Sequence, residues 1–274
     1  MTTPGSPGAF TEAGRHWAEQ LAAWAIPDGI LARAETPPWA HDPKTFAVDE
    51  TLDASSPVFE VARELLPAEG GSVLDVGCGG GRSSIPLAPR TRIIVGVDES
   101  ERMLARFAQA ADEMGVDHRE VVGRWPDVFI ASPESFSCDV VVCHHVVYNV
   151  PDLEPFVVAL TAAARLGVVV VMPKRHPLSA WNPGWRHFWG IERPDGPTHL
   201  DAVAVLGALG ISPEVFEVPR PPMSRHADDP TGLLASARQR LCLPASRDAE
   251  IAAWLADNPP DFMREVVVLR WPGD

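Results

Sequence analysis

The sequence predicts an α/β fold in which helices cover both faces of a doubly wound, mostly parallel sheet. Apolar segments alternate with helical segments from residue 72 to the end of the chain, and this order is typical of parallel sheets. Two of the apolar segments, DVVVC (139–143) and GVVVVM (167–172), are apolar at every position after the first. Strands without polar alternation are expected to be covered on both faces, which supports the same fold class.

The first 55 residues precede this alternation, and we expect them to form a flexible tail and a helical cap or lid. Residues 1–9 are rich in Thr, Pro, Gly and Ser and are predicted to be a loose tail. From Thr11 the pattern becomes helical, because Trp17, Leu21 and Trp24 are spaced to form one apolar stripe. Residues 40–55 are predicted to be a connection.

The remaining elements follow in order from Ser56, where Pro57 is suited to the first position of a helix. The stretch 177–198 does not fit the alternating pattern and is predicted to be an insertion after the fifth strand. Strands are expected over 72–76, 92–97, 118–122, 139–143, 167–172, 214–218 and 266–271. Helices are expected over 82–87, 101–114, 153–165, 199–209, 231–241 and 247–257.

The charge balance excludes several classes of partner. Asp and Glu outnumber Lys and Arg by 37 to 23, and the basic residues form no cluster, which argues against a nucleic acid or an anionic membrane surface. No apolar run reaches the roughly 20 residues of a membrane span, and the first residues do not resemble a secretory signal. The four cysteines have no metal-binding spacing, so we expect no metal site and a reduced, cytoplasmic protein.

The sharpest motif is VLDVGCGGGRS (73–83), in which an apolar strand runs into four glycines within five residues. Glycine permits positive φ and lets a ligand approach the backbone closely. A following helix would offer free N–H groups to the same ligand. The motif therefore predicts a ligand over this turn, and a tight strand–helix turn without a ligand is the alternative.

The residues around the glycines indicate which ligand it is. A dinucleotide fingerprint would need glycine where Arg82 stands. Asp75, two residues before the first glycine, suits a cationic or amine-bearing ligand better than a pyrophosphate. Asp98, after the second strand, is placed to accept hydrogen bonds from ribose hydroxyls, although it could instead cap the next helix. Met103, one turn into that helix, is placed to pack on an adenine ring.

These motifs resemble those of class I S-adenosylmethionine-dependent methyltransferases. VLDVGCGGG resembles the first motif of the family, VGVDES the acidic motif of the second strand, and DVVVCHHVVYNVPDL the fourth strand with its turn. The resemblance covers residues 56–175, and RQRLCLP and LRWPG near the end resemble an actinobacterial group of small-molecule type. It implies a Rossmann-like sheet of seven strands with the last antiparallel, a methyltransferase domain over 56–274, and S-adenosylmethionine as cofactor.

The resemblance also implies which residues meet the cofactor. At the place of a Gly-Asp pair that reads adenine in many members, this chain has GRWP (123–126). Adenine contact must then come from the backbone, from Trp125 stacking or from Asp127. The expected cofactor residues are Asp75, Gly77, Cys78, Gly79, Gly81, Asp98, Glu99, Met103, Arg124, Trp125 and Cys143.

The turn after the fourth strand contains the candidate catalytic residues His144, His145 and Tyr148. Histidine is the usual base at neutral pH, and a base is needed where a hydroxyl must lose a proton. A structural role in the turn is the alternative for each histidine. The Asn/Asp-Pro-Pro-aromatic motif of many amide and ring-nitrogen methyltransferases is absent here, which disfavours those acceptors.

Aromatic residues after the fifth strand, together with the N-terminal stripe, are predicted to bind the acceptor. Trp181, Trp185 and Phe188 also have the spacing of an ordinary amphipathic helix, so a core role is the alternative. We expect both segments to close over the strand ends and exclude water. The expected acceptor-binding residues are Trp17, His176, Trp181, Trp185 and His187.

The predicted function is methyl transfer to a small, partly apolar acceptor by in-line displacement. A catalytically silent S-adenosylmethionine-binding sensor or partner protein and a protein methyltransferase are the alternatives. An RNA acceptor is disfavoured by charge, and an NAD-dependent oxidoreductase by Arg82. The acceptor, its attacking atom and the oligomeric state remain open.

Overall fold

The computed structural model describes residues 10–39, 48, 53–218, 229–261 and 265–274, and within them seven strands form one sheet. The strand order is β3-β2-β1-β4-β5-β7-β6, and β7 alone runs antiparallel to the other six strands, as predicted. The strands are β1 (Gly71–Val76), β2 (Thr91–Asp98), β3 (Asp117–Val122), β4 (Cys138–His144), β5 (Ala164–Pro173), β6 (Glu214–Val218) and β7 (Val266–Pro272).

The two apolar strands of the sequence, β4 and β5, lie in the middle of the sheet and are buried on both faces. The chain order reverses between β1 and β4, which are neighbours in the sheet. Ligands of open parallel sheets bind outside the carboxyl ends of the strands at such a point. This topology puts the glycine loop after β1 and the histidine turn after β4 at one crevice.

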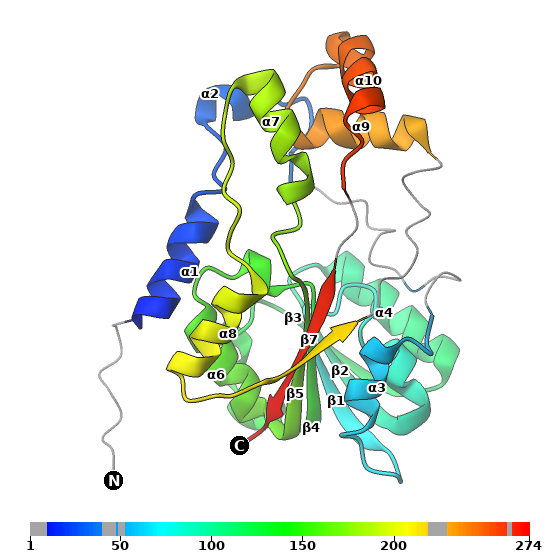
Figure 1. Cartoon of the computed structure of the whole chain (residues 1–274). Helices are drawn as coiled ribbons and strands as arrows, with labels where there is room; N and C mark the ends of the chain where they lie inside the picture. The colour runs from blue at the N-terminus through cyan, green and yellow to red at the C-terminus, as the bar shows by residue number, and fades with distance from the viewer. Residues whose placement is uncertain (1–9, 40–47, 49–52, 219–228, 262–264) are drawn as a thin grey trace.

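Helices pack on both faces of the sheet (Figure 1). One face is covered by α3 (Pro57–Arg63) and α4 (Glu101–Met114). The other is covered by α6 (Leu153–Ala163) and α8 (His199–Ala208), with α5 (Asp127–Ala131) beside them. The N-terminal helix α1 (Glu12–Ala22) packs against α6 and α8. Each face therefore has its own apolar core.

The segment after the glycine loop differs from the prediction. A helix was expected over 82–87, but the structure has a 3₁₀ helix over Ile85–Arg90. Pro86 and Pro89 explain the difference, because proline has no N–H to donate and its ring clashes with the preceding turn of an α-helix. A ligand over the loop therefore meets the loop backbone itself rather than the start of an α-helix.

A cap of helices lies beyond the carboxyl ends of the strands, and three distant segments build it (Figure 1). It consists of α2 (Asp28–Leu31), α7 (Asn182–Trp189), α9 (Pro230–Arg240) and α10 (Asp248–Asp257). Its apolar core is separate from those of the sheet and includes Trp181, Trp185, Leu241 and Ile251. The N-terminal segment and the insertion were expected in a cap. Of these, α2 and α7 lie in the cap, whereas α1 packs against α6 and α8 on the sheet, and the contribution of α9 and α10 was not predicted.

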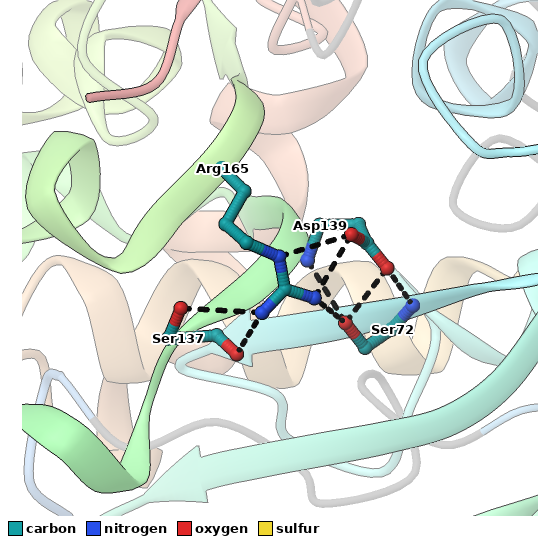
Figure 2. A network of polar contacts seen from close by, with 4 residues as sticks. All are labelled: Ser72, Ser137, Asp139 and Arg165. Carbon is teal, nitrogen blue, oxygen red and sulfur yellow. Dashed lines mark hydrogen bonds and ion pairs between the residues drawn. The ribbon is translucent and has the colours of Figure 1, made fainter.

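The opposite end of the sheet is held by a polar network (Figure 2). Arg165 donates from Nε and Nη2 to Asp139 Oδ1 over 3.1 and 2.9 Å, and Asp139 Oδ2 accepts from the Ser72 N–H over 2.7 Å. Burial alone would raise the pKa of Asp139, but the hydrogen bonds from Ser72 and Arg165 outweigh it and hold that pKa below its ordinary value. The network joins the amino ends of β1, β4 and β5, away from the crevice.

Candidate active site

The glycine loop has a backbone conformation that residues with a side chain rarely adopt. Gly77, Gly79 and Gly81 have φ of 71°, 53° and 93°. A Cβ on Gly77 would lie 2.5 Å from Cγ2 of Val146, which belongs to the turn after β4. The loop therefore needs glycine for its conformation and for its close approach to the neighbouring turn.

Asp98 is joined to the glycine loop. Its Oδ2 accepts from the Gly79 N–H over 3.0 Å, and its Oδ1 accepts from the Ser100 N–H over 2.9 Å. Ser100, not Asp98, is the N-cap of α4, and its hydroxyl accepts from the Met103 N–H over 3.4 Å. Asp98 is therefore not the residue that caps this helix. Its partly exposed carboxylate borders the glycine loop.

Asp75 is a fully buried carboxyl group beneath the loop. Its Oδ2 accepts from the Ser84 hydroxyl over 2.6 Å, while its Oδ1 is buried with no hydrogen-bond partner among the described residues. Burial raises the pKa of Asp75 to about 7, against the opposing effect of hydrogen bonds from Ser84 and Ser83. An unsatisfied buried oxygen of this kind is costly unless a ligand group pairs with it.

His144, the last residue of β4, and His145, the first residue of the turn after it, lie in different surroundings. His144 has a buried Nε2 with no partner in the described structure, and its ring lies 6.1 Å from that of Phe59. Burial, with a smaller effect of His145, lowers the pKa of His144 to about 3, so its imidazole is neutral. His145 is exposed, with φ of 62° and its N–H bonded to Val171 O over 2.7 Å.

Tyr148 uses its hydroxyl inside the protein. The O–H donates to Pro173 O over 2.9 Å, which joins the turn after β4 to the end of β5. The ring stacks on Trp17 at 5.7 Å, and Trp17 Nε1 donates to Val150 O over 2.8 Å. Burial raises the pKa of Tyr148. These contacts hold the Tyr148 side chain inside the protein and place α1 at the turn.

The other expected cofactor residues divide into buried and exposed groups. Cys78, Met103 and Cys143 are buried, and burial raises the pKa of both thiols, so neither is a thiolate. Glu99 and Arg124 are exposed.

Trp125 is a core residue. Its ring is 6% exposed, packs on Phe129 and Phe136 at 5.1 and 5.6 Å, and its Nε1 donates to Phe156 O. This placement leaves little ring surface for a ligand and disfavours the expected stacking on adenine. Contacts with Phe136 and with Phe156 of α6, which are distant from Trp125 in the sequence, hold the ring inward.

The expected acceptor-binding residues do not all lie together. Trp181 and Trp185 line a cleft in the cap, and His176 stacks on Trp24 with ring centroids 3.9 Å apart. His187 is instead exposed and stacks on Trp254 of α10.

Three neighbours of these residues were not among the candidates. Trp24 lay in the predicted apolar stripe, but its contact with His176 depends on the tertiary structure. Phe59 packs beside His144, and Arg193 beside Trp185, and neither carries a motif in the sequence.

Comparisons with known proteins find similarity to methyltransferases. A family model described as a methyltransferase domain matches residues 73–166. A ubiquinone biosynthesis O-methyltransferase of Agrobacterium fabrum is 37% identical over 103 residues, which are 37% of this chain and 39% of that protein. The chain thus matches about two fifths of the length of that relative.

Two further proteins are matched over a larger share of their own length. A phosphatidylethanolamine N-methyltransferase of Cereibacter sphaeroides is 30% identical over 150 residues, which are 50% of this chain and 73% of that protein. A cyclopropane-fatty-acyl-phospholipid synthase-like protein of Lactobacillus casei shares the fold, with a TM-score of 0.55, 13% identity, and coverage of 89% and 98% of the two chains.

The chain therefore belongs to the class I S-adenosylmethionine-dependent methyltransferases. S-adenosylmethionine is the methyl donor of this family, and the residues present fit it. The unpaired buried oxygen of Asp75 suits a cationic group, and the carboxylate of Asp98 beside the Gly79 N–H suits a diol. In the part of the chain that the structure describes, no helix is both long and apolar enough to cross a membrane.

Proposed function

We propose that this protein transfers a methyl group from S-adenosylmethionine to a hydroxyl oxygen of a small, partly apolar acceptor. The observation that carries the proposal is the imidazole of His144 at the end of β4, whose Nε2 is buried with no partner among the described residues. An oxygen acceptor has a proton to lose, and an imidazole nitrogen without a partner can accept it. Because burial makes this imidazole a weak base, the proton is transferred together with the methyl group and not before it. The similarity to an O-methyltransferase supports the same acceptor atom.

The residues of the crevice supply binding and orientation. When bound, S-adenosylmethionine supplies a methyl group on a positively charged sulfur. We infer that Asp98 accepts hydrogen bonds from the ribose hydroxyls, and that Asp75 stabilises a positive charge through Oδ1. The glycine loop lets the backbone lie against the donor. Alignment of this kind is the main contribution that an in-line displacement needs from a protein.

The end of β4 and the turn after it are the proposed site at which the acceptor binds and loses its proton. We infer that His144 Nε2 receives the hydroxyl proton as the acceptor oxygen bonds to the methyl carbon. Tyr148 holds the turn through its bond to Pro173 O, and Trp17 covers it. The cap would exclude water and admit only small molecules, which disfavours a protein acceptor.

The test replaces each histidine of the turn separately. His144→Gln should lower turnover of a phenolic acceptor about 10²- to 10⁴-fold, the usual contribution of a general base, without changing S-adenosylmethionine affinity. His145→Gln, at the exposed neighbour, is the matched control and should have a small effect. Product formation is followed by mass from isotopically labelled donor. If the two variants reverse these effects, His144 is not the base.

A nitrogen acceptor is the second candidate, because the similarity to a phosphatidylethanolamine N-methyltransferase covers 73% of that protein. A panel of phenols and amines distinguishes the two. Methylation of amines alone would favour the nitrogen acceptor, and binding of donor without any product would favour the silent sensor. The assignment to an actinobacterial small-molecule group stays a prediction.

A further inference from the structure

Ser84 begins the 3₁₀ helix Ile85–Arg90, but its hydroxyl does not cap that helix. It is the N-cap residue, and a serine at this position usually accepts a hydrogen bond from a backbone N–H of the helix. The Ser84 side chain makes no such bond. Its hydroxyl donates instead to Asp75 Oδ2 over 2.6 Å. The hydroxyl therefore serves the carboxyl group and not the helix.

The bond between Ser84 and Asp75 is shielded from water, since neither residue has exposed surface. The main chain fixes Ser84 to the glycine loop. Its N–H donates to Gly81 O over 3.2 Å, and its carbonyl accepts from the Leu87 N–H over 2.8 Å. The bond occupies Oδ2 of Asp75, whereas Oδ1 is buried with no partner among the described residues. Ser84 thus determines which oxygen of the carboxyl group remains available to a ligand.

The titratable groups around Asp75 do not stabilise its ionised form. Asp98, at the end of β2, acts on it through a like charge and raises the pKa of Asp75. The Cys78 and Cys143 thiols also interact electrostatically with Asp75, but they are protonated because burial raises the pKa of each thiol. Stabilisation of the ionised carboxylate is therefore left to hydrogen bonds.

Among those hydrogen bonds, the one from Ser84 has the largest effect. Burial raises the pKa of Asp75 to about 7, whereas the hydroxyl of Ser84, and to a smaller extent that of Ser83, lowers it. A hydroxyl that donates to a carboxylate favours the charged form over the neutral one. Water cannot replace the bond at a site without exposed surface.

We propose that Ser84 is a positioning residue, which fixes Asp75 through Oδ2, stabilises its ionised form and leaves Oδ1 available to a cationic group. Donors for methyl transfer carry such a group on sulfur. That the donor pairs with Asp75 rests on the proposed function above, whereas the effect of Ser84 on the carboxyl group does not.

The first measurement follows the Asp75 carboxyl group in the full chain without donor, through the ¹³C chemical shift of its carboxyl carbon. In Ser84→Ala the midpoint of this titration should rise by about one pH unit, because the ionised form loses a hydrogen bond. Ser72→Ala is the matched control. It removes a hydroxyl that donates over 3.0 Å to Asp139 at the opposite end of the same strand, and it should leave the midpoint of Asp75 unchanged.

The second measurement is the affinity for S-adenosylmethionine, by calorimetry at two pH values. Relative to the parent, Ser84→Ala should bind about 3- to 10-fold more weakly at about pH 6.5 and less than about 2-fold more weakly at about pH 8.5, where both carboxyl groups are ionised. Titration of the donor itself cancels in this ratio. A merely structural defect would weaken binding by the same factor at both pH values.

An unchanged midpoint in Ser84→Ala would overturn the proposal, and so would equal losses of affinity at the two pH values. If Ser84→Ala does not fold, as judged by near-ultraviolet circular dichroism, Ser84→Cys decides. Its thiol is of similar shape and a weaker donor, so it should give a smaller shift in the same direction. A shifted midpoint together with parent-like donor affinity in both Ser84→Ala and Asp75→Asn would support the positioning of the carboxyl group and contradict the role of Asp75 in the proposed function.

Discussion

At the scale of single residues, the site depends on polar groups that the protein leaves unsatisfied. Asp75 has one oxygen bonded to Ser84 and the other without a partner in the described structure, and its pKa is raised to about 7 by burial. The carboxyl group therefore binds a proton far more readily than an ordinary aspartate does. A cationic donor favours the ionised form, so donor binding and loss of this proton are coupled.

The coupling predicts how donor affinity depends on pH. Because the donor lowers the pKa of Asp75 below 7, the complex holds fewer protons than the free protein. S-adenosylmethionine affinity should therefore rise with pH up to about 7 and level off above it, and calorimetry at pH 6 should detect proton release. Asp75→Asn should bind more weakly and show no such dependence. Unchanged pH dependence in Asp75→Asn would exclude Asp75 as its source.

At the scale of elements, α1 is fixed to the site by a few specific contacts. Thr11 is its N-cap and also donates from its N–H to Glu154 Oε1 over 3.0 Å. Trp17 is fully buried, stacks on Tyr148 and donates to Val150 O. The helix thus stabilises the turn that carries His144.

Replacing Trp17 should separate the two contributions of this side chain. Trp17→Phe removes the hydrogen bond to Val150 O and leaves a small cavity, and should cost about 1–3 kcal/mol, whereas Trp17→Ala leaves a much larger cavity and should cost about 3–5 kcal/mol. The free energy of unfolding in urea measures both. Phe10→Ala, at a residue 42% exposed beside the same helix, should stay within about 0.5 kcal/mol of the parent. Equal costs for Trp17→Ala and Phe10→Ala would show that α1 is not docked as described.

At the scale of the whole molecule, the cap and the sheet have separate apolar cores. The cap core joins α7 to α9 and α10 through residues such as Trp185, Leu241 and Ile251, and none of its described residues belongs to the two cores of the sheet. Units with separate cores can open with separate free energies. A cap of this kind can admit an acceptor without disturbing the donor site.

Leu241→Ala tests that independence. Leu241 is fully buried in the cap, so the substitution should cost the cap about 2–5 kcal/mol. Hydrogen exchange should then become faster in α7, α9 and α10, while amides of β1, β4 and β5 keep their protection. Uniform acceleration across both regions would show that cap and sheet unfold as one unit.

The sequence predicted the parts of this molecule that depend on local chemistry. The glycine loop, Asp98 and the buried strands β4 and β5 each have a local pattern, and the structure places the loop and Asp98 in contact. The 3₁₀ helix over Ile85–Arg90 was missed although Pro86 and Pro89 were visible. The role of α9 and α10 in the cap and the inward turn of Trp125 arise from packing between distant segments, which spacing along the chain does not encode.

Calorimetric titration of S-adenosylmethionine into the parent protein and Asp98→Ala tests the central claim most directly. Loss of the carboxylate beside Gly79 should weaken binding by about 1–3 kcal/mol, roughly 5- to 150-fold, because hydroxyls of the donor lose their acceptor. Asp117→Ala, at the opposite end of the sheet on β3, is the control and should bind as the parent does. Unchanged affinity in Asp98→Ala, or tighter binding of a nicotinamide dinucleotide than of S-adenosylmethionine by the parent, would contradict the account.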